Sequence, residues 1–198
     1  LNAEGHSVNG NITVDGAALF TDYGYFNGSI TVESGELRIE GGIYNNNMSV
    51  KSGGKLFIFS GSCSKTATAE SGGLLSISNG GIVNIVAKSG STLEIINGSH
   101  TSVTVEENVN AVLSGGYFDK ISVAGNLIDC LEENRAFADN TTGKVIDGRT
   151  GEATNVHIVG HTHSCVWNTD THEKLCDCGY VEQTDSAAPV ISGVENGR

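Results

Sequence analysis

Short stretches of alternating apolar and polar residues recur along the first two thirds of the chain. Ile30–Val32 is followed by Leu37–Ile39, and equivalents of both stretches return after 18 or 19 residues. A period of two indicates β-strands that bury one face. Strands of about three to five residues are too short to bury that face alone, so the units must stack on one another.

Columns of like residues support this repeat. About seven units of about 18 residues run from about residue 11 to residue 126, and each inward position keeps its register. The inward columns are Ile12, Ile30, Met48, Ala67, Ile85, Val103 and Ile121; Val14, Val32, Val50, Ala69, Ala87, Val105 and Val123; Leu37, Leu56, Leu75, Leu93 and Ala111; and Ile39, Ile58, Ile77, Ile95 and Leu113.

The pattern predicts an all-β fold, a single-stranded right-handed parallel β-helix over residues 1–126. Parallel stacking places equivalent residues ~4.8 Å apart, so each column becomes a ladder. A left-handed β-helix also has about 18 residues per coil, but its hexapeptide spacing does not hold throughout this chain. Glycine recurs three residues after the last inward position and predicts a corner with positive φ. These glycines are Gly42, Gly61, Gly80, Gly98 and Gly116.

One outward column carries charges of alternating sign. From Glu33 onward, Glu33, Lys51, Glu70, Lys88 and Glu106 occupy equivalent positions. Opposite charges attract across neighbouring strands, whereas like charges repel. The alternation therefore supports the register, although each exposed pair contributes only ~0–1 kcal/mol.

The unit Val50–Gly61 resembles the glycine-rich repeats of the diffuse-adherence type of autotransporter adhesins. Those repeats form right-handed parallel β-helices on the bacterial surface. The resemblance is limited to the repeat region of the chain. It implies a right-handed parallel β-helix and an extracellular, cell-surface location.

Composition and charge narrow the classes of function. The chain has 27 glycines among 198 residues but one proline, Pro189, which argues against a disordered linker and against collagen. A formal charge of −12 argues against nucleic-acid binding, because phosphate neutralisation needs basic clusters. The apolar runs are too short for a membrane span. The start at Leu1 has neither Met nor a signal-peptide pattern and reads as trimmed.

The repeat stops near Asn126, and residues 127–160 are expected to close the end of the β-helix. Leu127, Ile128 and Leu131 have helical spacing, which predicts a short helical cap within residues 127–137. A turn at 139–144 and a strand at 153–160 follow. A cap is needed because the last coil otherwise exposes unpaired backbone groups.

A small module at residues 161–184 is rich in histidine and cysteine. Neutral imidazole and thiolate are the ligands that zinc prefers, and four protein ligands leave no open position for catalysis. A disulfide from Cys165 to Cys176 or Cys178 is the alternative, and five cysteines exclude complete internal pairing. The candidate ligands are His161, His163, Cys165, His172, Cys176 and Cys178.

This segment resembles a short module that recurs in large surface proteins of gut Gram-positive bacteria. The resemblance implies one structural zinc held by His163, His172, Cys176 and Cys178, with Trp167 as a packing residue. His161 is a substitute for one of these ligands, and Cys165 departs from the module. Residues 185–198 resemble a linker into an immunoglobulin-like repeat, which would make the chain a piece of a longer multidomain protein.

The β-helix itself offers little catalytic chemistry. Aspartate is absent between Asp22 and Asp119, so its middle coils hold no aspartate pair for glycoside hydrolysis. Cys63 and His100 share the inward column that follows the corner glycine but lie two coils apart, ~9–10 Å, beyond hydrogen-bond reach. We therefore expect both side chains in the core. Cys63 and Cys130 are also expected to be too distant for a disulfide.

Phe57 and Phe59 flank the inward Ile58 and are expected to point outward, beside Arg38 of the preceding coil. Exposed aromatic rings stack on sugars or mark a partner surface. A second interpretation is that a neighbouring segment, such as the N-terminal stretch, covers them.

Two functions remain at this stage. The first is a non-enzymatic module of a secreted bacterial surface protein, a spacer and adhesive β-helix whose partner is a host or microbial glycan or protein. The second is a β-helix that binds or cleaves glycans, as polysaccharide lyases and glycosidases do.

Overall fold

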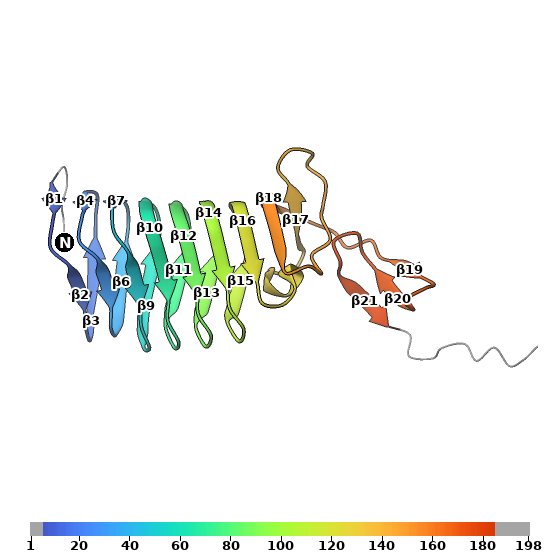
Figure 1. The fold of residues 1–198 in the computed structure, drawn as a ribbon, viewed down its shortest axis with the longest axis horizontal. Coiled ribbons are helices and arrows are strands. Elements are labelled where there is room, and N and C mark those ends of the chain that lie inside the picture. Colours follow the sequence, from blue (N-terminus) through green and yellow to red (C-terminus); the bar gives the residue numbers. More distant parts are fainter. Residues whose placement is uncertain (1–5, 185–198) are drawn as a thin grey trace, which may run out of the picture.

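The computed structural model describes residues 6–184, which form a rod of stacked coils with a small sheet beyond one end (Figure 1). The predicted all-β parallel solenoid is confirmed, with about six coils where the repeat suggested seven. Each coil contributes one strand to a six-stranded sheet and one or two strands to a twelve-stranded sheet. The six-stranded sheet consists of β3 (Ala17–Thr21), β6 (Gly35–Ile39), β9 (Gly54–Ile58), β11 (Leu74–Ile77), β13 (Thr92–Ile95) and β15 (Asn110–Leu113).

The larger sheet changes character along the rod. Each early coil gives it two short strands, whereas each later coil gives it one long strand, and β10 makes the transition by pairing with both β7 and β8. The short strands are β1 (Ser7–Val8), β2 (Ile12–Val14), β4 (Tyr25–Phe26), β5 (Ile30–Val32), β7 (Ile43–Tyr44) and β8 (Met48–Val50). The long strands are β10 (Ser62–Ala69), β12 (Gly81–Ala87), β14 (Ser99–Val105) and β16 (Tyr117–Val123).

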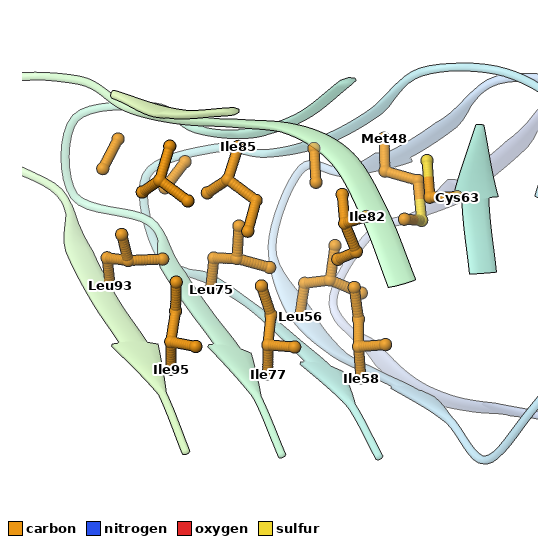
Figure 2. Packing of buried hydrophobic residues seen from close by; sticks show 14 of the residues in the cluster. Met48, Leu56, Ile58, Cys63, Leu75, Ile77, Ile82, Ile85, Leu93 and Ile95 are labelled. Atoms are coloured by element: carbon orange, nitrogen blue, oxygen red, sulfur yellow. The ribbon is translucent and has the colours of Figure 1, made fainter. Parts of the chain in front are cut away.

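The residues of each inward column predicted from the repeat are paired with one another in adjacent strands of the solenoid. Leu56 pairs with Leu75, and Leu75 with Leu93, in adjacent parallel strands. Figure 2 shows these leucines as one row, with the isoleucines of the same strands as a second row. All are buried. Burying a Leu or Ile side chain contributes roughly 1.5–3 kcal/mol, so the stacked rows supply the main driving force for folding.

Glycine is required at one corner of each coil. Gly42, Gly61, Gly80, Gly98 and Gly116 all have φ between 104° and 130°, which confirms the predicted positive φ. At Gly98 a Cβ atom would lie 2.5 Å from the carbonyl oxygen of Gly80 in the preceding coil. The corner therefore excludes side chains both by its φ and by the backbone stacked against it.

Gly98→Ala is expected to destabilise the solenoid by about 3 kcal/mol, because a backbone clash adds to an unfavourable φ. Gly53→Ala is the matched control. Gly53 has φ +82, but a Cβ atom there would have no other atom within 4 Å, so only the conformational cost of about 1 kcal/mol applies. Urea denaturation of both variants measures the difference. Equal losses would show that the close approach to Gly80 is not restrictive.

The alternating charge column forms ion pairs between neighbouring coils. Lys51 Nζ lies 2.7 Å from Glu33 Oε1, and Lys88 Nζ lies 2.9 Å from Glu70 Oε1. All four side chains are partly exposed, so each pair contributes ~0–1 kcal/mol. Their importance is that they confirm the register read from the sequence.

Cys63 and His100 belong to the core, as predicted. Both are buried and lie two strands apart with Ile82 between them in the register. Neither ring nitrogen of His100 has a hydrogen-bond partner within the described chain. Burial lowers the pKa of His100 to about 4, and the backbone of Ile82 and Asn97, which lies near the ring without forming a hydrogen bond of good geometry, only partly opposes this shift.

His100 should make the fold sensitive to acid. The pKa of His100 is about 4 in the folded protein, compared with the ordinary value of 6.5. Below pH 6.5 the unfolded chain therefore binds a proton at this residue that the folded chain does not bind. This group costs no stability above pH 6.5 and about 2 kcal/mol at pH 5. We expect His100→Leu to remove that part of the loss, as measured by denaturation at pH 7.5 and pH 5. An unchanged difference between the two pH values would contradict the neutral, buried state.

The short helix predicted within residues 127–137 is present only in part. A single 3-10 turn, η1 (Leu127–Cys130), is present, and the rest of the segment contains strand β17 (Arg135–Asp139). The amide of Leu127 donates to the carbonyl of Thr150, and the amide of Ile128 donates to that of Gly148, each at 2.9 Å. These two amides lie at the start of η1, where a helix leaves its N–H groups unpaired, so the loop at 148–150 satisfies them. The helix ends because Leu131 is extended, with ψ 143°, and the amide of Glu132 donates to the carbonyl of Leu113 in β15 at 3.0 Å.

An antiparallel strand pair closes the larger sheet instead. The predicted strand at 153–160 is β18 (Glu152–Gly160), which runs antiparallel to β16 of the last coil, and β17 pairs antiparallel with its other edge. Reversing the strand direction ends the parallel stack while still pairing the exposed backbone of β16.

The chain then leaves the rod. Strands β19 (Val166–Asn168), β20 (Glu173–Leu175) and β21 (Val181–Thr184) form a small antiparallel sheet beyond β17 and β18 (Figure 1). The linker and immunoglobulin-like start predicted for residues 185–198 lie outside the described residues.

Candidate metal centre

Two short motifs of the His/Cys module meet beside the end of the solenoid. His161 and His163 follow β18 directly, and the amide of His161 donates to the carbonyl of Asn134 at 2.9 Å. Cys176 and Cys178 lie in the turn between β20 and β21. The turn brings the two cysteines close together and places them against the two histidines.

The four side chains form a compact group, here called the metal group. Their ligand atoms all lie within 4.8 Å of one another. His161 Nε2 lies 3.0 Å from Cys176 Sγ, and His163 Nδ1 lies 3.3 Å from Cys178 Sγ. Ligands of a tetrahedral zinc ion are ~3.3–3.8 Å apart, given Zn–N of ~2.0 Å and Zn–S of ~2.3 Å. The group can therefore hold a metal ion.

The surroundings of Cys178 disfavour a free thiolate. Burial raises the pKa of the Cys178 thiol to about 11, the backbone near Tyr180 opposes the rise, and Cys176 and Asp177 add to it. A coordinated cation reverses this balance, because it compensates the thiolate charge and displaces the proton.

The turn that carries the cysteines is hydrogen-bonded to the loop that precedes β18. The amide of Cys176 donates to the carbonyl of Tyr180 at 2.9 Å, and that of Gly179 donates to the carbonyl of Cys176 at 3.0 Å. The carbonyl of Cys178 in turn accepts a hydrogen bond of 2.8 Å from the amide of Gly148. These bonds connect the metal group to the loop that precedes β18.

The stacking of Tyr180 and the packing of Ala136 complete this attachment. The ring of Tyr180 stacks on His163 with centroids 4.2 Å apart. Cys176, Cys178 and Ala136 of β17 are buried together. A metal ion here would therefore join the module to the end of the solenoid.

His172 is the one predicted ligand that the structure does not bring to the metal group, and His161 takes its place. His172 lies in the turn between β19 and β20, has φ 57°, and donates its amide to the carbonyl of Asn168 at 3.0 Å. Strand β20 separates it from Cys176 by four residues, ~13 Å in an extended chain. Sequence spacing alone does not reveal this, because it depends on where the hairpin turns.

Cys165 and Trp167 also differ from the expectation. All five cysteines are free in the structure, and Cys165 is not part of the metal group. Burial and the charge of Cys176 raise the pKa of the Cys165 thiol. Trp167, expected to pack, is 47% exposed.

The outward residues of the six-stranded sheet gather around one arginine. The guanidinium carbon of Arg38 lies 5.6 Å from the ring centroid of Phe57, 6.0 Å from that of Phe59 and 5.7 Å from that of Phe20. Cation–π contacts of this kind contribute ~0.5–1 kcal/mol at exposed sites. These four residues are called the aromatic cluster.

Phe57 and Phe59 are half-buried by Arg38 and by one another, with ring centroids 6.4 Å apart. Arg38 is also paired with Glu36. Phe20 was missed in the sequence, although it precedes Arg38 by one repeat and pairs with it in the register. The repeat itself would have identified it.

No helix in the described part of the chain has the length and hydropathy that a bilayer crossing requires. A comparison of the chain with protein-family models, curated proteins and solved structures finds no match.

Proposed function

We propose that this chain is a non-enzymatic module of a secreted bacterial cell-surface protein. The solenoid acts as a rigid spacer with an adhesive surface, and a zinc ion joins the small His/Cys module to its end. The metal group is the observation that carries the proposal. Four protein ligands fill a tetrahedral zinc site, so such an ion stabilises structure and has no position for substrate.

Zinc is the metal that this donor set favours. Two imidazoles and two thiolates suit a borderline-soft ion with tetrahedral preference, whereas calcium and magnesium prefer oxygen ligands. The module has few buried apolar residues, so an additional constraint is needed to order it. The bond from Gly148 to Cys178 extends that constraint to the cap.

The rod also fits a spacer. Each coil contacts its two neighbours along the rod. A stack of such coils is therefore long and stiff, although it has no globular core. The net charge of −12 and the resemblance to adhesin repeats support display at a cell surface, with a host or microbial glycan or protein as partner.

Metal analysis of untagged protein, with thiol titration alongside, tests the metal part of this proposal. We expect about one zinc ion per chain. No metal together with two fewer titratable thiols would show that a disulfide closes the module, and the zinc assignment would be withdrawn.

A glycan-binding or glycan-cleaving β-helix is the second candidate, and the aromatic cluster favours it. Hydrolase and lyase assays on plant, mucin and host glycans distinguish the two candidate functions. Turnover that disappears when a surface carboxylate such as Glu36 is replaced would contradict the non-enzymatic function. Binding without turnover that is lost in Phe57→Ala would place the adhesive site on the solenoid.

A further inference from the structure

A cleft of about 840 Å³ lies next to the metal group. One wall is the segment that follows β18, and the other is the β19–β20 hairpin at the far end of the rod (Figure 1). The cleft is shallow and open to solvent over most of its extent, so a ligand bound there keeps one face exposed.

The hairpin wall offers one aromatic face and a free amide. Trp167 lines the cleft and is 47% exposed. The Oδ1 atom of Asn168 accepts hydrogen bonds from the amides of Asp170 and Thr171, at 2.9 and 3.3 Å. This fixes the side chain, whose NH₂ group is a further hydrogen-bond donor.

Besides His161 and Cys176 of the metal group, the remaining polar residues of the lining are Thr162, Ser164, Thr169 and Asp177. Thr162 lines the opposite wall, and Asp177, whose side chain is 71% exposed, lies at the edge. Its Oδ1 atom lies 3.3 Å from His161 Nε2 and accepts a hydrogen bond of 3.1 Å from the Cys176 thiol, so its other oxygen is the one left for a ligand. Neither Lys nor Arg is among the described residues that line the cleft. An anionic ligand would therefore meet a carboxylate without a compensating cation.

We propose that this cleft binds one neutral pyranose unit of a surface glycan. A pyranose has an apolar C–H face that packs on an indole and a rim of hydroxyls for amide, hydroxyl and carboxylate partners. The inference rests on the adhesive function proposed above. It adds to the adhesive surface of the solenoid a second contact, made by Trp167, Asn168 and Asp177 of the small sheet.

The metal ion would hold this cleft in shape without touching the sugar. His161 belongs to one wall and Cys176 to the other, and both belong to the metal group. An ion bound there joins the two walls directly. Glycan binding should therefore depend on metal, although the metal is not a ligand of the glycan.

A neutral-glycan array identifies the best ligand, and titration of that ligand follows the fluorescence of Trp167, the only tryptophan in the chain. We expect Trp167→Ala, read by calorimetry, to weaken binding at least tenfold and Asp177→Asn to weaken it several-fold. Tyr25→Ala is the matched control, because Tyr25 is also 47% exposed but lies on β4. Zinc content of each variant shows whether the module is intact.

The outcomes separate this inference from the proposed function. Binding lost in Phe57→Ala but kept in Trp167→Ala would overturn the cleft and leave an adhesive solenoid. Absence of binding to every neutral glycan by the metal-loaded protein would overturn the cleft, while zinc content tests the metal group independently. Binding that depends on Trp167 but survives chelation would refute the metal's role in shaping the walls.

Discussion

Ile58→Asp is expected to destabilise the solenoid by about 4 kcal/mol or more. Ile58 is buried between Ile39 and Ile77 of the neighbouring coils, so the new carboxylate has neither water nor a cation to compensate its charge. Each coil is stabilised mainly by its neighbours, and the loss therefore reaches both adjoining contacts.

Phe57→Asp is the control for this variant, one residue away on the outward face. It removes cation–π and stacking contacts that contribute about 1 kcal/mol each, so a loss below about 2 kcal/mol is expected. Denaturant unfolding followed by circular dichroism measures both variants. Equal destabilisation would mean that the assigned register is wrong.

The second large effect concerns the metal group. Separate replacement of His161 and Cys178 by Ala should lower the zinc content from about one ion per chain to near zero, since three ligands hold zinc far less tightly. His172→Ala should leave it unchanged, because His172 lies in the hairpin turn. Elemental analysis after exhaustive dialysis gives the values.

Loss of the metal should affect the module and spare the rod. We expect limited proteolysis to cut within residues 161–184 of the His161→Ala variant while the coils stay resistant, because their stability depends on their own neighbours. Zinc lost in His172→Ala but kept in His161→Ala would restore the ligand set implied by the sequence resemblance.

The solenoid could be predicted because its information is local and repeated. A leucine at 37, 56, 75 and 93, with an isoleucine two residues later, fixes both the inward face and the register. Gly61 and its equivalents were predictable for the same reason, since each coil turns its corner against the previous one.

The length of the cap and the choice of metal ligands were not predicted in this way. Leu127, Ile128 and Leu131 have helical spacing, but Leu131 is extended and bridges to Leu113 of β15, one repeat earlier in the chain. The inward column therefore continues to Leu131 and ends the helix there. The choice between His161 and His172 depends on the path of β18 and on the β19–β20 turn, which occur once, so no repeat reveals it.

X-ray absorption at the zinc edge of the metal-loaded protein tests the central claim most directly, because it identifies the ligand atoms themselves. The ligand set His161, His163, Cys176 and Cys178 predicts two sulfur atoms at ~2.3 Å and two nitrogen atoms at ~2.0–2.1 Å, with no oxygen in the first shell. A zinc ion surrounded by nitrogen and oxygen alone would contradict the account, because the two cysteines would then not hold the metal.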